Sequence, residues 1–297
     1  MKGHNLNDKI FNLINYTIMI LLTIVTLYPF LHVLAVSLND AFDSMLGGIT
    51  IFPRKFTWTN YIETLKYPQI YPAAFMTLLR TIVGTITSVI ATAIVAYVLS
   101  RKDFFARKFV TILFVVTMYV SAGLIPSYLL IRHLGLMNNF LVYILPGLIN
   151  PFNVIVIRSY IDSNIPDELT ESAMMDGAND FLIFWRIVFP LCMPVIATVS
   201  LWVAVGHWNS WFDTYIYCSG NPKLTTLQFE LQKILTSAAR SSNIDYYSML
   251  DPTKTMRVTP ESLRMAMTII VTFPILLIYP FIQRYFIHGL TIGAIKG

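Results

Sequence analysis

The sequence predicts an all-helical protein that crosses a membrane several times, and three observations support this fold class. Hydrophobic residues make up 56% of the 297 residues and charged residues only 12%, which is about half the share usual in soluble domains. Apolar runs of membrane-spanning length recur along the chain, and prolines stand inside several of them. One water-soluble core cannot bury so much apolar surface, so we expect lipid to be the solvent for most of the chain.

Six apolar segments are long enough to cross the hydrocarbon core, which takes roughly 20 helical residues. They cover residues 13–36, 73–99, 109–131, 141–160, 187–205 and 263–282. The first is longer than the core of a signal peptide, which has roughly 7 to 15 apolar residues, so we interpret it as a retained span. Prolines inside the spans indicate a packed bundle in which neighbouring helices satisfy the freed backbone groups.

The short loops predict the orientation of these spans. Four basic residues lie in residues 100–108, whereas the short loop after the third span carries only Arg132. Short loops rich in Lys and Arg stay in the cytoplasm. The predicted organisation is a cytoplasmic N-terminal tail (1–12), a six-span domain (13–282) with a cytoplasmic loop (161–186), and a cytoplasmic C-terminal tail (283–297).

Composition and motifs exclude several other classes of protein. The net charge of +5 comes from basic residues scattered among the loops, which is typical of topology signals and not of a nucleic-acid-binding stripe. Two cysteines without a CxxC motif or a histidine pair indicate neither a disulfide framework nor a metal site. Lys296 is not followed by Ser or Thr, so the glycine-rich C-terminus fails the phosphate-binding loop pattern. No catalytic residue, metal ligand or cofactor is expected on this chain.

An acidic segment interrupts the apolar runs. Six of the 16 acidic residues lie between Asp162 and Asp180, and inserting them would cost on the order of 15 kcal/mol, so this segment stays in water. Pro166 at its start and Gly177 past its end predict a helix of about eleven residues. Its apolar edge of Ile165, Leu169 and Ala173 is typical of a helix that docks in a groove of another protein; the alternative is a helix lying on the bilayer, which would favour Lys and Arg.

The same segment carries a recognisable spacing of glutamate, alanine, glycine, isoleucine and proline. The residues are Glu171, Ala173, Gly177, Ile187 and Pro190. This pattern resembles the EAA signature of ABC importer permeases, with Ser172 and Phe189 as departures. The stretch "MMDGA" and the C-terminal "YFIHGLTIGAIKG" further resemble the carbohydrate-uptake, maltose-transporter-like branch of that family.

The resemblance implies the six-helix type I, MetI-like permease fold, with both termini in the cytoplasm. It implies that the acidic loop forms coupling helices seated in a cleft of an ATPase subunit, with Glu171 on the docking surface and Gly177 at the turn. The residues assigned to ATPase coupling are Glu171, Ala173, Met174, Asp176, Gly177 and Ala178.

The resemblance also implies the partners and the activity. The chain would be the permease of an ATP-driven importer of sugars, with oligosaccharides as the expected class, working by alternating access in a bacterial cell membrane. The expected partners are a second homologous permease, two ATP-binding cassette subunits that bind ATP and Mg, and an extracytoplasmic solute-binding protein. A proton- or sodium-coupled secondary transporter is the alternative, but no Asp or Glu lies near the centre of an expected span. No intramembrane enzyme motif is present either.

A substrate path would need polar groups facing a cavity. The stretch "GHWNSWFD", residues 206–213, places polar and aromatic side chains at the outer end of the fifth expected span; indoles stack on sugar rings and amides bind hydroxyls. An interfacial aromatic belt, or helix packing in the case of the asparagines, is the favoured alternative. The residues considered for the path are Asn150, Asn153, His207, Trp208, Asn209 and Trp211.

The remaining segments carry open alternatives. Leucines at helical spacing from Leu224 to Leu235 predict an amphipathic outer helix. The polar stretch 243–260 is either a contact for the binding protein or a solvated connector. The C-terminal tail either approaches the ATPase, as in the family it resembles, or is a flexible end.

Overall fold

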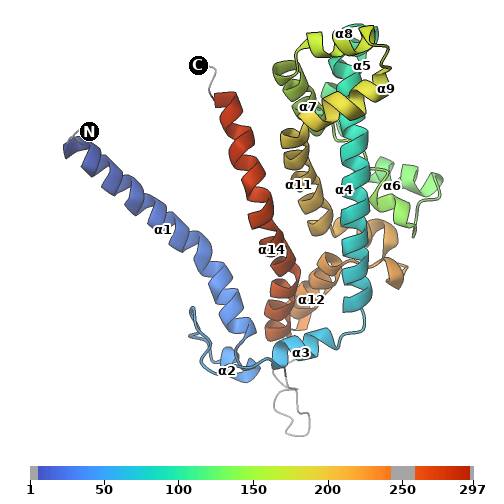
Figure 1. The fold of residues 1–297 in the computed structure, drawn as a ribbon. Coiled ribbons are helices and arrows are strands. Elements are labelled where there is room, and N and C mark those ends of the chain that lie inside the picture. The colour runs from blue at the N-terminus through green and yellow to red at the C-terminus, as the bar shows by residue number, and fades with distance from the viewer. Residues whose placement is uncertain (1–5, 242–257, 295–297) are drawn as a thin grey trace. The chain divides into compact units, whose positions relative to one another are not determined.

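The computed structural model describes residues 6–241 and 258–294. Regular structure in these ranges is helical, and only one isolated bridge, between Asn39 and Phe56, joins extended segments there (Figure 1). The chain divides into two compact units: Met1–Pro68 with Leu231–Phe273, and Gln69–Glu230 with Pro274–Gly297. The stretch 243–260, considered above for a binding-protein contact, lies almost wholly outside the described residues.

The first unit is built on long apolar helices. Helix α1 (Leu6–Ser37) and helix α14 (Pro260–Ala294) agree with the first and last expected spans, although α14 continues through most of the expected C-terminal tail. Nearly all α1 side chains are exposed, as expected for a helix surrounded by lipid. Two short helices follow α1, α2 (Ala41–Met45) and α3 (Thr59–Leu65).

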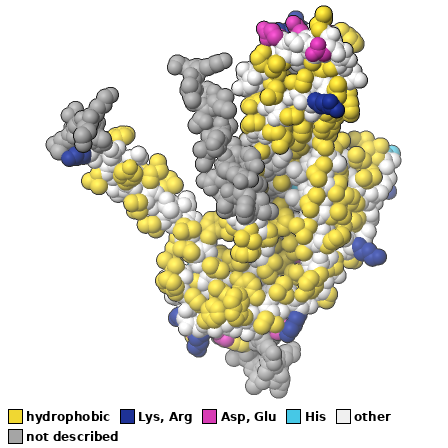
Figure 2. All heavy atoms as spheres, viewed as in Figure 1, with side chains coloured by type: hydrophobic (Ala, Val, Ile, Leu, Met, Phe, Trp, Pro, Cys, Tyr) yellow, Lys and Arg dark blue, Asp and Glu magenta, His cyan; other side chains and the backbone are white. Residues whose placement is uncertain are grey.

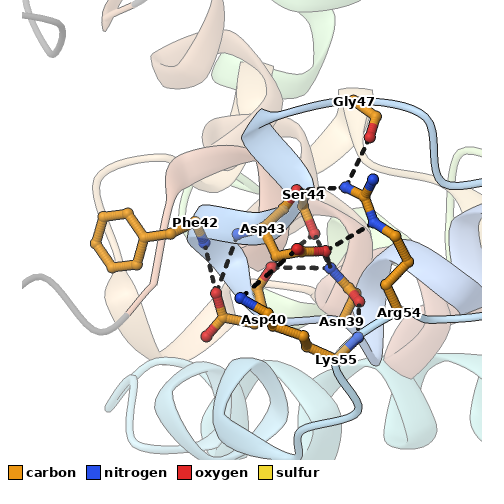
Figure 3. A network of polar contacts seen from close by, with 8 residues as sticks. All are labelled: Asn39, Asp40, Phe42, Asp43, Ser44, Gly47, Arg54 and Lys55. Carbon is orange, nitrogen blue, oxygen red and sulfur yellow. Dashed lines mark hydrogen bonds and ion pairs between the residues drawn. The ribbon is translucent and has the colours of Figure 1, made fainter.

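A polar network fixes the loop around α2 (Figure 3). Asn39, fully buried, donates to Asp43 at 2.9 Å and accepts from the backbone N–H of Lys55 at 2.7 Å. Arg54 donates from Nε to Asp43 at 3.0 Å and from Nη2 to the Gly47 carbonyl at 2.7 Å. The Asn39 hydrogen bond and then Arg54 hold the pKa of Asp43 below its usual value. Buried polar groups are therefore satisfied without a regular sheet.

The second unit contains the remaining helices. Its longer helices are α4 (Ile70–Ser100), α5 (Arg107–Tyr119), α6 (Leu124–His133), α7 (Pro151–Asn164), α8 (Asp167–Met175) and α11 (Met193–Asn209), and α12 (Leu227–Ser241) begins here. Its short elements are the 3₁₀ helices η1 (Phe140–Tyr143) and η4 (Pro222–Leu224), the π-helices η2 (Phe184–Val188) and η3 (Thr214–Cys218), α9 (Asp180–Ile183) and α10 (Phe189–Leu191). Helix α4 packs against α7 and α11 through a core that includes Ala93, Ala96, Val154, Ile157, Ile183 and Val199.

The third expected span is a bent pair of helices, and the fourth forms no single helix of membrane-spanning length, so the fourth prediction is wrong. Residues 109–131 divide into α5 and α6, whose axes differ by 119°. Residues 141–160 hold only a short 3₁₀ turn before α7, which has 14 residues. Pro146 and Gly147 interrupt the apolar run, and Asn150 caps α7 by accepting from Phe152 N at 3.0 Å, with Pro151 in the first turn. Proline removes a helical donor and restricts the residue before it, which explains the break before α7. The break between α5 and α6 ends at Gly123, whose φ of +85° is outside the helical region.

The fifth expected span is also bent. The segment Asp180–Leu191 and helix α11 meet at 82°, where Pro190 and Pro194 lie close together. Three described helices are long and apolar enough to cross a membrane, and up to five spans result if each bent pair is one span. The expected amphipathic helix is confirmed as α12, although Leu224 lies before it, in η4. Its expected position on the outer side stays a prediction.

Candidate functional site: an acidic helix and a membrane-side cavity

Helix α8 is built by the local signals that predicted it. Pro166 occupies the N-cap position, Asp167 and Glu168 fill the first turn, and the helix has nine residues. Gly177 has φ +82°, a left-handed conformation that glycine adopts without steric cost. Its N–H donates to the Met174 carbonyl at 2.9 Å, which closes the end of the helix.

The residues assigned to coupling divide into an exposed and a packed group. Glu171, Met174 and Asp176 are exposed, with Met175 the most exposed at 88%. Ala173 and Ala178 pack against the core of the second unit. Acidic and basic side chains gather at the end of this unit that carries α8, while the face below is mostly apolar (Figure 2). The expected apolar docking edge is wrong in part, because Ile165 is buried in the core and only Leu169 is largely exposed.

The loop that follows α4 holds both ends of this acidic segment. Lys102 pairs with Asp167 at the start of α8, and this hydrogen bond raises the pKa of Lys102. Arg101 lies 3.9 Å from the Asp180 carboxylate, which also accepts from Tyr97 Oη at 3.3 Å. Between the loop and α8 lies a cavity of about 270 Å³. The loop that follows α4 is thus tied by charge to the start of α8 at Asp167 and to the start of α9 at Asp180.

A second, larger cavity of about 560 Å³ lies among α4, η1, α7 and α11. Asn150, Asn153 and His207 line it, so three of the six residues considered for a substrate path come together. The other three do not line it. Trp208 is buried at 6% exposure, Asn209 donates to the Val205 carbonyl of its own helix at 3.0 Å, and Trp211 packs on Phe212 and Tyr215.

An ion pair in the cavity wall was not predicted. Arg80, on α4, is 1% exposed and grips Asp213 with two hydrogen bonds, of 3.2 Å from Nη1 and 2.5 Å from Nη2. The guanidinium also lies 4.3 Å from the centre of the Tyr143 ring. A fully buried charge is expensive unless it is paired, so this pair is one of the strongest constraints in the unit.

His207 is fixed by a close approach of two helices. A Cβ atom at Gly84 of α4 would lie 2.4 Å from Nε2 of the His207 ring. Only glycine therefore leaves room for this imidazole between α4 and α11. Among the described residues, no group of three or more His, Cys, Asp or Glu side chains is placed to hold a metal ion.

The helical fold, the three described helices of membrane-spanning length and the apolar surface indicate a membrane-embedded protein. Residues 88–292 match the family described as binding-protein-dependent transport system inner membrane component, and the chain belongs to that family. The resemblance to ABC importer permeases is confirmed, and the family is one of transport components and not of enzymes.

Individual relatives cover almost the whole chain. The polygalacturonan/rhamnogalacturonan transport system permease protein YtcP of Bacillus subtilis (strain 168) is 32% identical over 293 residues, 98% of this chain and 100% of that protein. Protein LplC of the same organism is 34% identical over 274 residues, 92% and 90% of the two chains. A solved bacterial ABC transporter involved in the import of the acidic polysaccharide alginate has a chain with TM-score 0.85 and 28% identity, covering 96% of this chain and 100% of that one.

Proposed function

We propose that this chain is the permease subunit of an ATP-driven, binding-protein-dependent importer of oligosaccharides. Relatives named for polygalacturonan, arabinooligosaccharides and maltodextrin support a sugar substrate. The observation that carries the coupling role is the exposed acidic helix α8, which the loop after α4 holds at Asp167, while the same loop contacts Asp180 at the start of α9. ATP and Mg would be bound by partner subunits, and α8 would carry their motion into the bundle during alternating access.

The assembly follows from the same proposal. The chain would reside in a bacterial cell membrane as a multi-pass protein with both termini in the cytoplasm, beside a second homologous permease. Of the two ATPase subunits, one would bind this chain around Glu171, Ala173, Met174, Asp176, Gly177 and Ala178 on the cytoplasmic side, and the other would bind the second permease. A solute-binding protein would deliver sugar on the outer side. The cavity lined by Asn150, Asn153 and His207 would form part of the path.

The coupling role is tested by two substitutions in α8 and its turn. The tagged chain is purified with its partners from its native membrane, and ATPase activity and sugar uptake are measured. Glu171→Lys reverses an exposed charge, and Gly177→Asp strains a left-handed position. We expect both to reduce ATPase retention or to separate ATP hydrolysis from uptake, with normal membrane insertion.

Glu63→Gln changes a partly exposed acid in α3 of the other unit, where it pairs with Lys66. This variant is the matched control and should behave as wild type. Wild-type uptake and ATPase retention in both α8 variants would overturn the coupling assignment. Uptake by the wild-type complex that continues without ATP and stops with an ionophore would instead favour a secondary transporter.

A further inference from the structure

We propose that Asp213 is a sugar-binding residue, whose carboxylate accepts hydrogen bonds from ring hydroxyl groups in the larger cavity, and that Arg80 is its positioning residue. The inference rests on the proposed function and names the contact that the sugar would make in this subunit. It starts from the one carboxylate among the residues that line this cavity.

The carboxylate of Asp213 has free accepting capacity toward the cavity. Its side chain is 23% exposed, whereas that of Arg80 is only 2% exposed. Oδ1 accepts from Arg80 and from the N–H of Thr214 at 2.8 Å, while among the described residues Oδ2 accepts from Arg80 alone. An ionised carboxylate offers about four acceptor sites, so at least one remains for a ligand. A hydroxyl group is a donor that matches it.

Arg80 holds this carboxylate in one orientation. Its two terminal nitrogens grip both carboxylate oxygens, and Nη1 also lies 3.4 Å from the Ser210 carbonyl. The guanidinium is stacked on Tyr143, whose hydroxyl donates to the Leu224 carbonyl at 2.6 Å. A planar, two-point contact with such support fixes the position and orientation of the carboxylate. Asp213 is therefore the residue that contacts the ligand, and Arg80 orients the Asp213 carboxylate.

The other walls fit a sugar ring and not a small ion. Phe152 and Trp202 form an aromatic wall with ring centres 5.8 Å apart, and both line the cavity. Aromatic faces pack on the CH surface of a sugar, and amide side chains such as those of Asn150 and Asn153 can form hydrogen bonds with its hydroxyl groups. A volume of about 560 Å³ is within the range of small-molecule sites, roughly 300 to 1,000 Å³. The juxtaposition of apolar wall, amides and fixed carboxylate is the chemistry of carbohydrate recognition.

The test uses the whole importer, reconstituted in proteoliposomes with ATP, and three probes: arabino-oligosaccharides, malto-oligosaccharides and oligogalacturonides. We expect Asp213→Asn to raise the KM of the transported probe about tenfold, because a charged acceptor is exchanged for a neutral one. The maximal rate should change much less. Asp40→Asn, which replaces an N-cap acid outside the cavity by an equally good N-cap residue, is the matched control and should leave KM unchanged.

Loss of Asp213 also leaves Arg80 uncompensated, so a double variant separates binding from folding. Arg80→Gln with Asp213→Asn removes both charges, which buried pairs tolerate better than the loss of one. Protection of the buried Cys218 thiol from alkylation reports folding of this region. A double variant that regains thiol protection but keeps the raised KM supports a ligand contact.

A double variant that regains both thiol protection and the wild-type KM would show that the pair is structural, and would overturn the inference. So would an unchanged KM in the folded Asp213→Asn protein. These results leave the proposed function intact, because the wild-type complex still imports sugar with ATP. A wild-type complex that imports none of the three probes would contradict the proposed sugar importer itself, together with the role of Asp213.

Discussion

The two charged regions of the second unit use the same pairing in opposite surroundings. Arg80 and Asp213 meet in the wall of a cavity, with the arginine almost fully buried. Lys102 and Asp167 meet at the exposed end of α8, with both side chains more than half exposed. Burial makes the first pair important for stability, because removing one partner would leave the other as an uncompensated charge in the cavity wall.

The contrast indicates which of the two contacts can rearrange at the lower free-energy cost. An exposed pair contributes little free energy and is screened by salt, so it can guide α8 without locking it. A buried pair has no such freedom. If α8 transmits motion, as we propose, the movable contact is at the water-facing end of α4 and the fixed contact is at the cavity.

The largest expected loss of stability comes from a substitution that removes one partner of the buried Arg80–Asp213 pair. Arg80→Met would leave the Asp213 carboxylate without its partner and lower the free energy of unfolding by about 3–5 kcal/mol. The rate of Cys218 alkylation in detergent measures this loss, because the thiol is buried in the folded chain. An alkylation rate equal to that of wild type would contradict the assigned strength of the pair.

A smaller effect is expected at the helix contact beside that pair. Gly84→Ala places a methyl group 2.4 Å from the His207 ring, and relieving such overpacking typically costs about 1–3 kcal/mol. The midpoint temperature of thermal unfolding in detergent should fall accordingly. Adding His207→Ala to the Gly84→Ala variant should restore part of the lost stability. No recovery in the double variant would mean that another neighbour causes the strain.

The polar network of the first unit gives a pH-dependent effect. The Asn39 hydrogen bond and then Arg54 lower the pKa of Asp43, so the ionised form stabilises the folded loop. This stability is present above the usual carboxyl pKa of about 3.9 and is lost as the pH falls through the lowered folded value. Proteolysis of the loop after Lys55 should accelerate below that pH. Asp43→Asn should be cleaved faster already at pH 7, with a flatter pH profile.

The smallest expected change in stability comes from removing the exposed Lys102–Asp167 pair. Lys102→Gln should leave the thermal unfolding midpoint unchanged at physiological salt, because both partners are solvated. A change in the ratio of ATP hydrolysed to sugar imported is the informative measurement, and the charge-reversed pair Lys102→Asp with Asp167→Lys should bring the ratio back. A large drop in the unfolding midpoint of the single variant would contradict the comparison between the two pairs.

The sequence predicted helix α8 well because its signals are local. Pro166 at the start and Gly177 at the end act within a few residues of the positions they define, and the structure confirms both. The fourth expected span failed for a related reason. Mean apolarity from residue 141 to 160 measures preference for lipid, whereas Pro146 and Pro151 decide whether the backbone can be one helix.

The Arg80–Asp213 pair was missed because its partners are 133 residues apart in the chain. A signal was present, since Arg80 is the one charged residue within the apolar run 73–99, and such a residue calls for a partner. Arg80 is basic, so the absence of acids near the span centres gives no indication of it. Asp213 looked like part of an aromatic belt, and only the folding of α4 against α11 places the two together.

The shortness of α7 has a consequence for how the protein is made. Fourteen helical residues rise about 21 Å, less than the hydrocarbon thickness of about 30 Å. The free energy gained by transferring so short a segment into lipid is too small for it to insert stably by itself during synthesis. We expect α7 to insert stably only after α11 has been synthesised, because α7 packs against both α4 and α11. Truncation of the chain before α11 should therefore leave α7 accessible to water-soluble labels.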